Sequence, residues 1–447
     1  MKKVTNPRQL AVLTLNGYDK TEDFLREVLN LRLGQSNLSA ADQVLYTELV
    51  YGTVRMQKNL DYILSIFSRR PLEKVPRLIL YNLRLAVYQI MYLDRVPDFA
   101  AVNEAVNLAR RFGHQGTVSF TNGVLRQVVK NKGNIVYPSA AIDLTGHLAV
   151  KYSYPRWIIQ HWLAQLGSEE TERLCRAMNR SPEMQVRVNT LRATREEVQA
   201  HLLEAGITVL PGRYAPDVLR VSPAQLVIRS SWLAAGKFYI QGESSALAAH
   251  ALGAKPDMTV YDLCSAPGGK ATHLAQLMGN QGKILALDAN RARLGLVREN
   301  AERLGVSIIS TLQADARREQ PLPQADAVLV DAPCSGLGTM RQRPDIRWRK
   351  SKNEIEGLVA VQKAILKQAA AYVRPGGVLL YSTCTLTSWE NQEVAHSFLE
   401  ENAPFAGAAL PAWFPQTEKE TPWMRTFWPH LHGLDGFFVS LFRKRET

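Results

Sequence analysis

The sequence has few cysteines, and their spacing excludes two common roles. It contains only Cys175, Cys264, Cys334 and Cys384, and none lies within four positions of another. Without a CxxC pair a zinc finger is not expected, and we predict no metal site. Four cysteines in a chain of 447 residues also do not suggest a disulfide framework. A buried, inert thiol is therefore the default interpretation for each, and thiol chemistry has to be argued from its surroundings.

Long apolar runs are also missing. No run approaches the roughly 20 residues that a membrane helix needs. The first residues, MKKVTNPRQL, carry two lysines but no sustained apolar segment after them, so we expect no signal peptide and a cytoplasmic protein.

The sequence also lacks internal repeats, since no segment recurs at a solenoid period. At about 100–200 residues per domain, the length predicts two to four domains.

The positive charge is large and unevenly distributed. The net charge is +13, which is typical of proteins with an acidic partner such as nucleic acid, although a basic surface also serves solubility. Residues 1–140 carry 19 Lys and Arg against 11 Asp and Glu, and residues 341–352, here called the basic strip, carry six against one. These two regions account for the whole excess.

Three patterns of apolar residues follow one another along the chain. Apolar residues recur at helical spacing to about residue 135, and Ser39 is a good N-cap before LSAADQVLYTELVYGTVR. After a Lys, Gly, Asn and Pro-rich break at 130–140, short extended segments such as MQVRVNTL alternate with helical ones. From about 257, strands alternate with helices, which predicts a doubly wound parallel sheet.

These three sequence patterns predict a multi-domain fold with an all-α front, a small α/β middle unit and a Rossmann-like α/β domain. The expected bounds are 1–135 for the helical domain, 136–165 for a linker and helix, 166–240 for the small α/β domain, and 241–447 for the Rossmann-like domain.

Acidic residues follow four successive strands of the last domain, at the sheet end where ligands bind in such folds: Asp262, Asp288, Asp315 and Asp331. The stretch CSAPGGKATH (264–273) opens the first helix. It lacks both GxGxxG and the P-loop spacing, so neither a dinucleotide fingerprint nor a phosphate loop is expected. These features suit S-adenosylmethionine (SAM), with its ribose on Asp288, its adenine near Asp315 and its methionine end over the Gly loop.

Cys334 and Cys384 follow two successive strands of the same domain, so we expect both thiols to face one pocket beside the cofactor loop. Carbon 5 of cytosine is a poor nucleophile, and a thiolate that adds to carbon 6 activates it for methylation. The residues alone do not say which thiol attacks. We expect the neighbouring cations to lower a thiol pKa and hold phosphates, and Asp331 to bind the base edge or the donor.

The motifs DLCSAPGGK, DAPCSG, RQRPDIRW, YSTCT and DGFFVSLF resemble those of the RNA cytosine-5 methyltransferases. The front, with AADQVLYTELVYGTVR, VNEAVNLAR and FTNGVLRQ, resembles the NusB-like domain fused to one branch of that family, the bacterial 16S ribosomal RNA methyltransferases of the Sun or Fmu type. The segments RVNTLR and YIQGESSAL resemble its middle region, which implies an RRM-like domain. The resemblance covers essentially the whole chain.

This resemblance implies Cys384 as the nucleophile and Cys334 as the thiol that assists product release, whereas DNA cytosine methyltransferases attack with their Pro-Cys thiol. It also implies SAM as cofactor. The implied cofactor residues are Cys264, Ser265, Ala266, Pro267, Gly268, Gly269, Lys270, Asp288, Asp315 and Asp331. The sequence departs from the family at Ser265, where Ala is usual, and at Gln342, where a basic residue is common.

The implied partner is 16S ribosomal RNA, before or during assembly of the small subunit, with a monomeric enzyme and no membrane. We expect the basic strip to contact RNA phosphates through Arg341, Arg343, Arg347, Arg349 and Lys350. Trp348 either stacks on a base or anchors the loop against the sheet. Glu390 is expected in a capping box with Thr387, His273 in packing, and Cys175 as inert.

Three other functions fit parts of the pattern. They are a DNA cytosine methyltransferase, a non-enzymatic RNA-binding or antitermination factor, and a small-molecule methyltransferase. The intact thiols and Gly loop argue against the second, and the basic strip argues against the third.

Overall fold

The computed structural model describes residues 4–417 and 421–446, and the chain forms two compact units. The helical unit comprises residues 1–179 together with 342–349, and the α/β unit comprises residues 180–341 and 350–447. The chain therefore leaves the α/β unit at the basic strip, enters the helical unit for eight residues, and returns. No helix of the described residues is long and apolar enough to cross a membrane.

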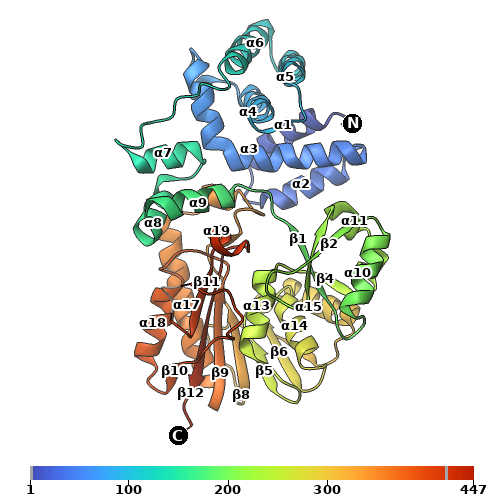
Figure 1. Ribbon diagram of the computed structural model, residues 1–447, viewed down its shortest axis with the longest axis vertical. Coiled ribbons are helices and arrows are strands. Elements are labelled where there is room, and N and C mark those ends of the chain that lie inside the picture. The colour runs from blue at the N-terminus through green and yellow to red at the C-terminus, as the bar shows by residue number, and fades with distance from the viewer. Residues whose placement is uncertain (1–3, 418–420, 447) are drawn as a thin grey trace. The chain divides into compact units, whose positions relative to one another are not determined.

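The helical unit confirms the all-α front. Ser39 caps the longest helix, because its side chain accepts a hydrogen bond from Asp42 N, and Tyr46, Leu49, Val50 and Leu60 of that helix are buried in the core. The helices are α1 (Pro7–Tyr18), α2 (Leu25–Gly34), α3 (Ala40–Phe67), α4 (Arg77–Tyr92), α5 (Asp98–Phe112), α6 (Gln115–Lys130), α7 (Leu144–Lys151), α8 (Arg156–Leu166), α9 (Ser168–Met178) and α16 (Ile346–Arg349), with a 3-10 turn η1 (Leu72–Lys74) (Figure 1).

The helical unit extends further along the chain than the break in the helical pattern at 130–140 suggests. Helices α7, α8 and α9 belong to it, so residues 166–179 lie with the front helices and not with the small sheet.

A small antiparallel sheet opens the α/β unit. Its strands are β1 (Met184–Val188), β2 (Thr208–Pro211), β3 (Val218–Ser222) and β4 (Phe238–Ile240), in the order β2-β3-β1-β4. It carries α10 (Arg195–Glu204), α11 (Ala224–Ile228) and α12 (Ser231–Ala234). Helix α10 starts with a complete capping box between Thr194 and Glu197, which explains why the chain turns from strand to helix at that point.

The large sheet has the order β10-β12-β9-β8-β5-β6-β7, and β11 pairs with β12. Its strands are β5 (Thr259–Asp262), β6 (Lys283–Asp288), β7 (Ile309–Gln313), β8 (Ala325–Asp331), β9 (Val373–Thr383), β10 (Phe405–Gly407), β11 (Met424–Phe427) and β12 (Phe437–Lys444). The remaining elements are α13 (Glu243–Leu252), α14 (Gly269–Leu277), α15 (Arg291–Leu304), η2 (Leu337–Thr339), α17 (Lys352–Tyr372), α18 (Gln392–Glu401) and α19 (Pro429–His432).

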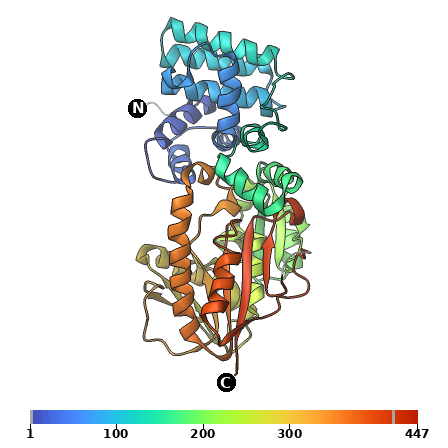
Figure 2. The same cartoon turned by 90° about the vertical axis from the view of Figure 1, so that its left-hand side faces the viewer.

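Both faces of this sheet are covered by helices, as a doubly wound sheet requires. Successive strand residues point to opposite faces. Val260 packs into a core with α13, α14 and α15, whereas Tyr261 packs into a second core with α17 and α18. Figure 2 shows α17, in orange, running along the strands. The Rossmann-like fold is thus confirmed.

The expectation of a purely parallel sheet needs correction, because the sheet is mixed. Strands β5 to β9 are parallel, but β12 pairs antiparallel with β9 and β10. The terminal motif DGFFVSLF supplies β12. It follows β11 after a short turn through α19, and such a short connection favours antiparallel pairing.

Candidate active site

The topology places the strand-end residues at one point of the sheet. Strand β5 lies between β6 and β8, so the chain reverses its direction of winding there. Ligands of open α/β sheets bind at the carboxyl ends of the strands beside such a switch point. Asp262 ends β5 and Asp331 ends β8, and both line the same cavity.

This cavity has a volume of about 230 Å³ and is built around the Gly loop. Its lining includes six residues of that loop (Cys264, Ser265, Ala266, Pro267, Gly269 and Lys270) and Asp331. It also includes Tyr239, Gln241, Gly242, Ser245 and Asp262, which were not predicted as cofactor residues. Four of these five belong to YIQGESSAL, which begins within the short strand β4 and continues into the turn after it; this extended segment was the signal available in the sequence.

The buried carboxyl group of Asp262 limits the kind of ligand that the cavity favours. The residue is 1% exposed, and neither carboxylate oxygen has a hydrogen-bond partner at the usual distance among the described residues. Burial raises the pKa of Asp262 to about 7, and the nearby Asp331 adds to the shift. Interactions with Ser265, Lys270 and Cys264 N oppose this pKa shift without making a hydrogen bond of the usual geometry. A buried carboxyl group in this state favours a cationic or hydrogen-bond-donating ligand. SAM, with its ammonium and sulfonium groups, fits this requirement.

Asp331 is already engaged on both of its oxygens. Lys270 Nζ donates to Oδ2 at 2.6 Å, and Ser382 Oγ donates to Oδ1 at 2.9 Å. These contacts tie the Gly loop to the ends of β8 and β9, and they fix the direction of this carboxylate at the cavity wall.

Asp288 and Asp315 lie outside the residues that line the cavity. Asp288 accepts hydrogen bonds from Ala266 N (3.3 Å) and Asn290 N (2.9 Å), so it supports the back of the Gly loop. Asp315 lies just beyond β7, and its carboxylate is bound by Arg317, which holds the pKa of Asp315 down at about 2.

The two predicted thiols lie in contact. Cys334 follows β8 and Cys384 follows β9, and these neighbouring parallel strands bring the two Sγ atoms to 3.2 Å from each other. Cys384 N also donates to Cys334 Sγ at 3.3 Å. The side-chain hydrogen bond with the Cys384 thiol and burial together raise the pKa of Cys334 well above its usual value, and the backbone hydrogen bond from Cys384 N opposes this shift. The expectation that neighbouring cations lower a thiol pKa is therefore not met at Cys334.

Close backbone contacts hold the two thiol loops to the terminal motif. Gly338 N donates to Cys384 O, and Gly436 N donates to Gly338 O, both at 2.9 Å. A Cβ at Gly338 would lie 2.0 Å from the Gly436 carbonyl oxygen, so only glycine fits at Gly338. Next to it, Arg341 pairs with Asp435, with Nη2 at 2.9 Å from Oδ1. The Gly and Asp of DGFFVSLF thus serve this packing.

The other cations of the basic strip are placed differently from what its sequence suggests. Arg347 is fully buried in the helical unit, where its Nη1 donates to Ser153 O (3.0 Å), Asn179 Oδ1 (3.0 Å) and Arg55 O (3.2 Å). Its guanidinium lies 4.1 Å from the ring centroid of Tyr154. A side chain with these contacts is not available to a phosphate, which corrects the role expected for Arg347.

Arg349 and Trp348 are also used inside the helical unit. Arg349 donates to Tyr18 OH, Thr21 O and Glu22 O, and Trp348 Nε1 donates to Val54 O at 2.8 Å. Trp348 thus anchors its loop, but it does so on α3 of the helical unit and not against the sheet, which corrects the expected anchoring role. Arg343 is exposed, and Lys350 is partly exposed, with Glu354 at 3.9 Å.

The small sheet reaches the Gly loop through Arg187 of β1. This side chain is buried and donates from Nη1 to Gly269 O at 2.7 Å and from Nη2 to Thr272 Oγ1 at 3.2 Å. Its guanidinium also lies 5.3 Å from the ring centroid of Tyr239, which lines the cavity. The small sheet and the Gly loop therefore share one hydrogen-bonded framework.

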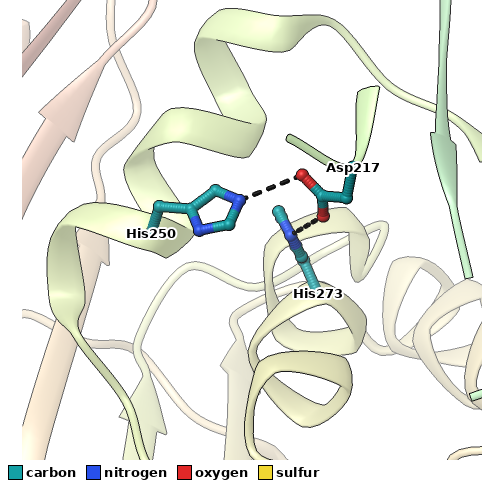
Figure 3. A group of neighbouring side chains, drawn as sticks. All are labelled: Asp217, His250 and His273. Atoms are coloured by element: carbon teal, nitrogen blue, oxygen red, sulfur yellow. Dashed lines mark hydrogen bonds and ion pairs between the residues drawn. The ribbon is translucent and has the colours of Figure 1, made fainter. Parts of the chain in front are cut away.

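A second polar cluster joins the same parts of the α/β unit (Figure 3). Asp217, just before β3, accepts hydrogen bonds from His273 Nε2 on α14 (2.6 Å), from His250 Nε2 on α13 (3.0 Å) and from Gln276 (3.2 Å). The carboxylate oxygen of Asp217 and the ring nitrogens of His250 and His273 lie within 4.8 Å of one another, a spacing that could hold a metal ion, although no metal site was predicted.

Hydrogen bonding already accounts for the geometry of this cluster. Burial and then the charge of Arg187 lower the pKa of His273 to about 4, so the ring is neutral at pH 7 and donates its Nε2 proton to Asp217. This agrees with a packing role for His273. The wide sequence spacing of Asp217, His250 and His273 offered no signal of their meeting.

The fold, the cavity at the switch point and the Gly loop together define a SAM-dependent methyltransferase of the Rossmann-like class. Comparison with known proteins gives the family. Residues 249–443 match the family described as 16S rRNA methyltransferase RsmB/F, residues 5–130 match the NusB family, and residues 154–227 match the RsmF/B-like ferredoxin-like domain.

Similarity extends over the full length of the chain. It is 37% identical to the "Probable ribosomal RNA small subunit methyltransferase B" of Bacillus subtilis, with 100% of both chains covered. The solved structure of PH0851 is 29% identical, with a TM-score of 0.81, and the match covers 99% of this chain and 100% of that one. NSun6 from Pyrococcus horikoshii with SFG, a SAM analogue, is 25% identical with a TM-score of 0.61, covering 66% and 100%.

The chain therefore belongs to the ribosomal RNA small subunit methyltransferase B family, and it is a methyltransferase that uses SAM. This removes the non-enzymatic binding factor from the functions considered above.

Proposed function

We propose that this protein methylates carbon 5 of a cytosine in 16S ribosomal RNA through a covalent bond between Cys384 and the base. The observation that carries the proposal is the 3.2 Å contact between the sulfur atoms of Cys334 and Cys384. Cys334 follows Asp331, which lines the cavity, by three residues, and Cys384 follows Ser382, which donates to Asp331, by two. The names of the family and of its Bacillus subtilis member support the RNA substrate.

In the proposed reaction, one thiol attacks the base and the other assists product release. The Cys384 thiolate bonds to carbon 6, which makes carbon 5 nucleophilic, and carbon 5 then bonds to the methyl group. SAM supplies that methyl group as an electrophile when it is bound. A base removes the proton from carbon 5, and the electrons of that C–H bond re-form the double bond between carbons 5 and 6. The bond between sulfur and carbon 6 breaks, and its electrons leave on sulfur as the Cys384 thiolate. Cys334 stands beside the leaving sulfur and assists this release.

The residues that would hold SAM surround the cavity. Those that line it are Asp262, Asp331, Tyr239, Gln241, Gly242 and the loop residues Cys264, Ser265, Ala266, Pro267, Gly269 and Lys270; Gly268 belongs to the same loop. Asp288 would reach the ribose from the back of the loop, and Asp315 would lie near the adenine. For RNA phosphates, the exposure of Arg343 and Lys350 makes them the strip residues that we propose as contacts. We further propose a cytoplasmic, monomeric enzyme that acts before or during assembly of the small subunit.

Single cysteine variants test the mechanism. We expect Cys384→Ala to lose both methyl transfer and the covalent adduct with RNA. Cys334→Ala should still attack and methylate, but it should stay bonded to the RNA and give a slow band on a denaturing gel. Because the base must leave its stack to reach Cys384, single-stranded target RNA should react best.

Cys175→Ala is the matched control, because Cys175 is buried in the helical unit and should leave both readouts unchanged. An adduct in Cys384→Ala but none in Cys334→Ala would show exchanged roles, as in DNA cytosine methyltransferases. Absence of adducts from every variant and from the wild type would end the carbon-5 mechanism. Bisulfite mapping of 16S RNA from a strain lacking the protein would locate the modified cytosine.

A further inference from the structure

Glu390 is a fully buried carboxylate between β9 and α18, close to both thiol loops. Its Oε1 accepts from Ser335 N at 2.7 Å and from Gln362 Nε2 at 3.2 Å. Its Oε2 accepts from Ser335 Oγ at 2.6 Å and from Thr387 Oγ1 at 2.7 Å. Four donors therefore surround one carboxylate, and this is the condition under which a buried charge is tolerated.

A capping box does not explain these contacts. Thr387 does bond to Glu390, as the spacing of three suggested. However, α18 begins only at Gln392, so Glu390 precedes the helix instead of occupying its third position. Most of the acceptor capacity of the carboxylate goes to residues from other parts of the chain.

The donors connect Glu390 to both thiol loops. Ser335 directly follows Cys334. Gln362, on α17, also donates to Pro333 O at 3.0 Å, so the residues on both sides of Cys334 are tied to the same carboxylate. Thr387 lies three residues beyond Cys384.

A hydroxyl chain links the two loops directly. Ser335 Oγ and Thr385 Oγ1 are 2.7 Å apart, and Thr385 directly follows Cys384. Because Ser335 gives its single hydroxyl proton to Glu390, Thr385 must donate to Ser335. Ser335 and Thr385, which follow the two cysteines, are therefore linked to each other and, through Ser335, to Glu390.

We infer that Glu390 is a positioning residue that fixes the Cys334 loop against the Cys384 loop, so that both sulfur atoms meet the same base. The inference rests on the proposed function, and it adds a group outside the thiols and the cofactor cavity. Hydrogen bonds to a carboxylate are short and strong, so this anchor resists small displacements of either loop. A misplacement of about 1 Å near reacting groups can cost on the order of 100-fold in rate.

The sharpest test removes the hydroxyl link and keeps the fold. Ser335→Ala and Thr385→Val each break the link between the loops but leave Glu390 bound to Ser335 N. We expect each variant to slow product release by about tenfold, as loss of a buried hydrogen bond predicts. The covalent adduct with natural RNA should then accumulate. The double variant should be no worse than Ser335→Ala, because that change already removes the link that Thr385→Val removes.

Glu390→Gln is a second variant that keeps the side-chain volume and one acceptor oxygen. It should accumulate adduct as Ser335→Ala does, and its affinity for SAM in calorimetry should stay within about twofold of the wild type because it does not line the cavity. Thr14→Val is the matched control. It removes a buried hydroxyl contact to Tyr46 in the helical unit and should lower thermal stability without adduct accumulation.

The outcomes separate this inference from the proposed function. If the wild type forms no adduct that depends on Cys384, the proposed function itself fails. If it does form one, but folded Ser335→Ala and Thr385→Val release product at the wild-type rate, only the role of Glu390 is overturned. Additive losses in the double variant would also overturn it, because they would mean that the two hydroxyls act separately.

Discussion

The Gly loop and the basic strip use their polar groups in opposite ways. Residues 264–267, 269 and 270 line a cavity, and the strand ends beside them contribute the carboxylates of Asp262 and Asp331 to its lining. The basic strip uses much of its charge inside the protein: Arg347 and Arg349 donate to groups of the helical unit, and Arg341 pairs with Asp435. A run of cations in a sequence is therefore weaker grounds for an RNA contact than a Gly loop is for a ligand site.

Both regions depend on a buried arginine that bonds to backbone carbonyl groups. Arg187 holds Gly269 O and so supports the Gly loop, whereas Arg347 holds Arg55 O and Ser153 O and so supports the helical unit. The difference lies in what each arginine stabilises. One acts on the cofactor cavity, and the other fixes a segment that the chain sends from the α/β unit into the helical unit.

Replacement of Arg347 should have the largest effect on stability. Arg347→Met leaves buried carbonyl oxygens of Arg55 and Ser153 without this donor, at about 1–3 kcal/mol each, so we expect a loss of about 3 kcal/mol in unfolding free energy. Thermal unfolding followed by a probe in the helical unit measures it. Arg343→Met, at an exposed position of the same strip, is the control and should change stability little. Normal stability with weakened RNA binding in Arg347→Met would restore the RNA-contact interpretation.

The next effect concerns cofactor affinity. Asp288→Ala removes the acceptor of Ala266 N and the proposed ribose contact, so we expect SAM affinity to fall by about 1.5–3 kcal/mol. Asp315→Ala should cost less, because that carboxylate is already bound by Arg317. Isothermal titration calorimetry on both variants makes the comparison. Unchanged affinity in Asp288→Ala would remove Asp288 from the site, and equal losses would contradict the ranking.

The smallest effect separates the cations within the strip. If Arg343 contacts a phosphate, Arg343→Gln should reduce the slope of log K against log salt for RNA binding by about 0.7–0.9. Lys350→Gln should do the same. Arg349→Gln should leave the slope unchanged, because its guanidinium donates to Tyr18, Thr21 and Glu22. Filter binding at several salt concentrations is sufficient, and a reduced slope only in Arg349→Gln would reverse the assignment.

Much of the fold follows from local sequence patterns. Helical periodicity predicted the front domain, and alternation of strands and helices predicted the Rossmann-like domain, because burial of one helix stripe or sheet face imposes a period on the sequence. The antiparallel β12 was missed, since a buried strand looks the same whichever way its neighbour runs.

The chain order alone predicted that Cys334 and Cys384 would lie near each other. Each follows a buried strand, and ends of neighbouring parallel strands meet at one edge of the sheet, where the two sulfurs are 3.2 Å apart. The same rule accounts for Asp262 and Asp331 at the cavity. Local position in the chain is sufficient here because the sheet converts it into a fixed place in space.

Only the tertiary structure decided the roles of the charged side chains. Arg347 and Arg343 are four residues apart in the same basic strip, yet one is fully buried and the other is exposed. Glu390 and Asp217 likewise gain their partners from residues far away in the chain. The function of a charge depends on its solvent exposure and on its partners, and long-range packing sets both, whereas the positions of strands and glycine turns are set by short stretches of sequence.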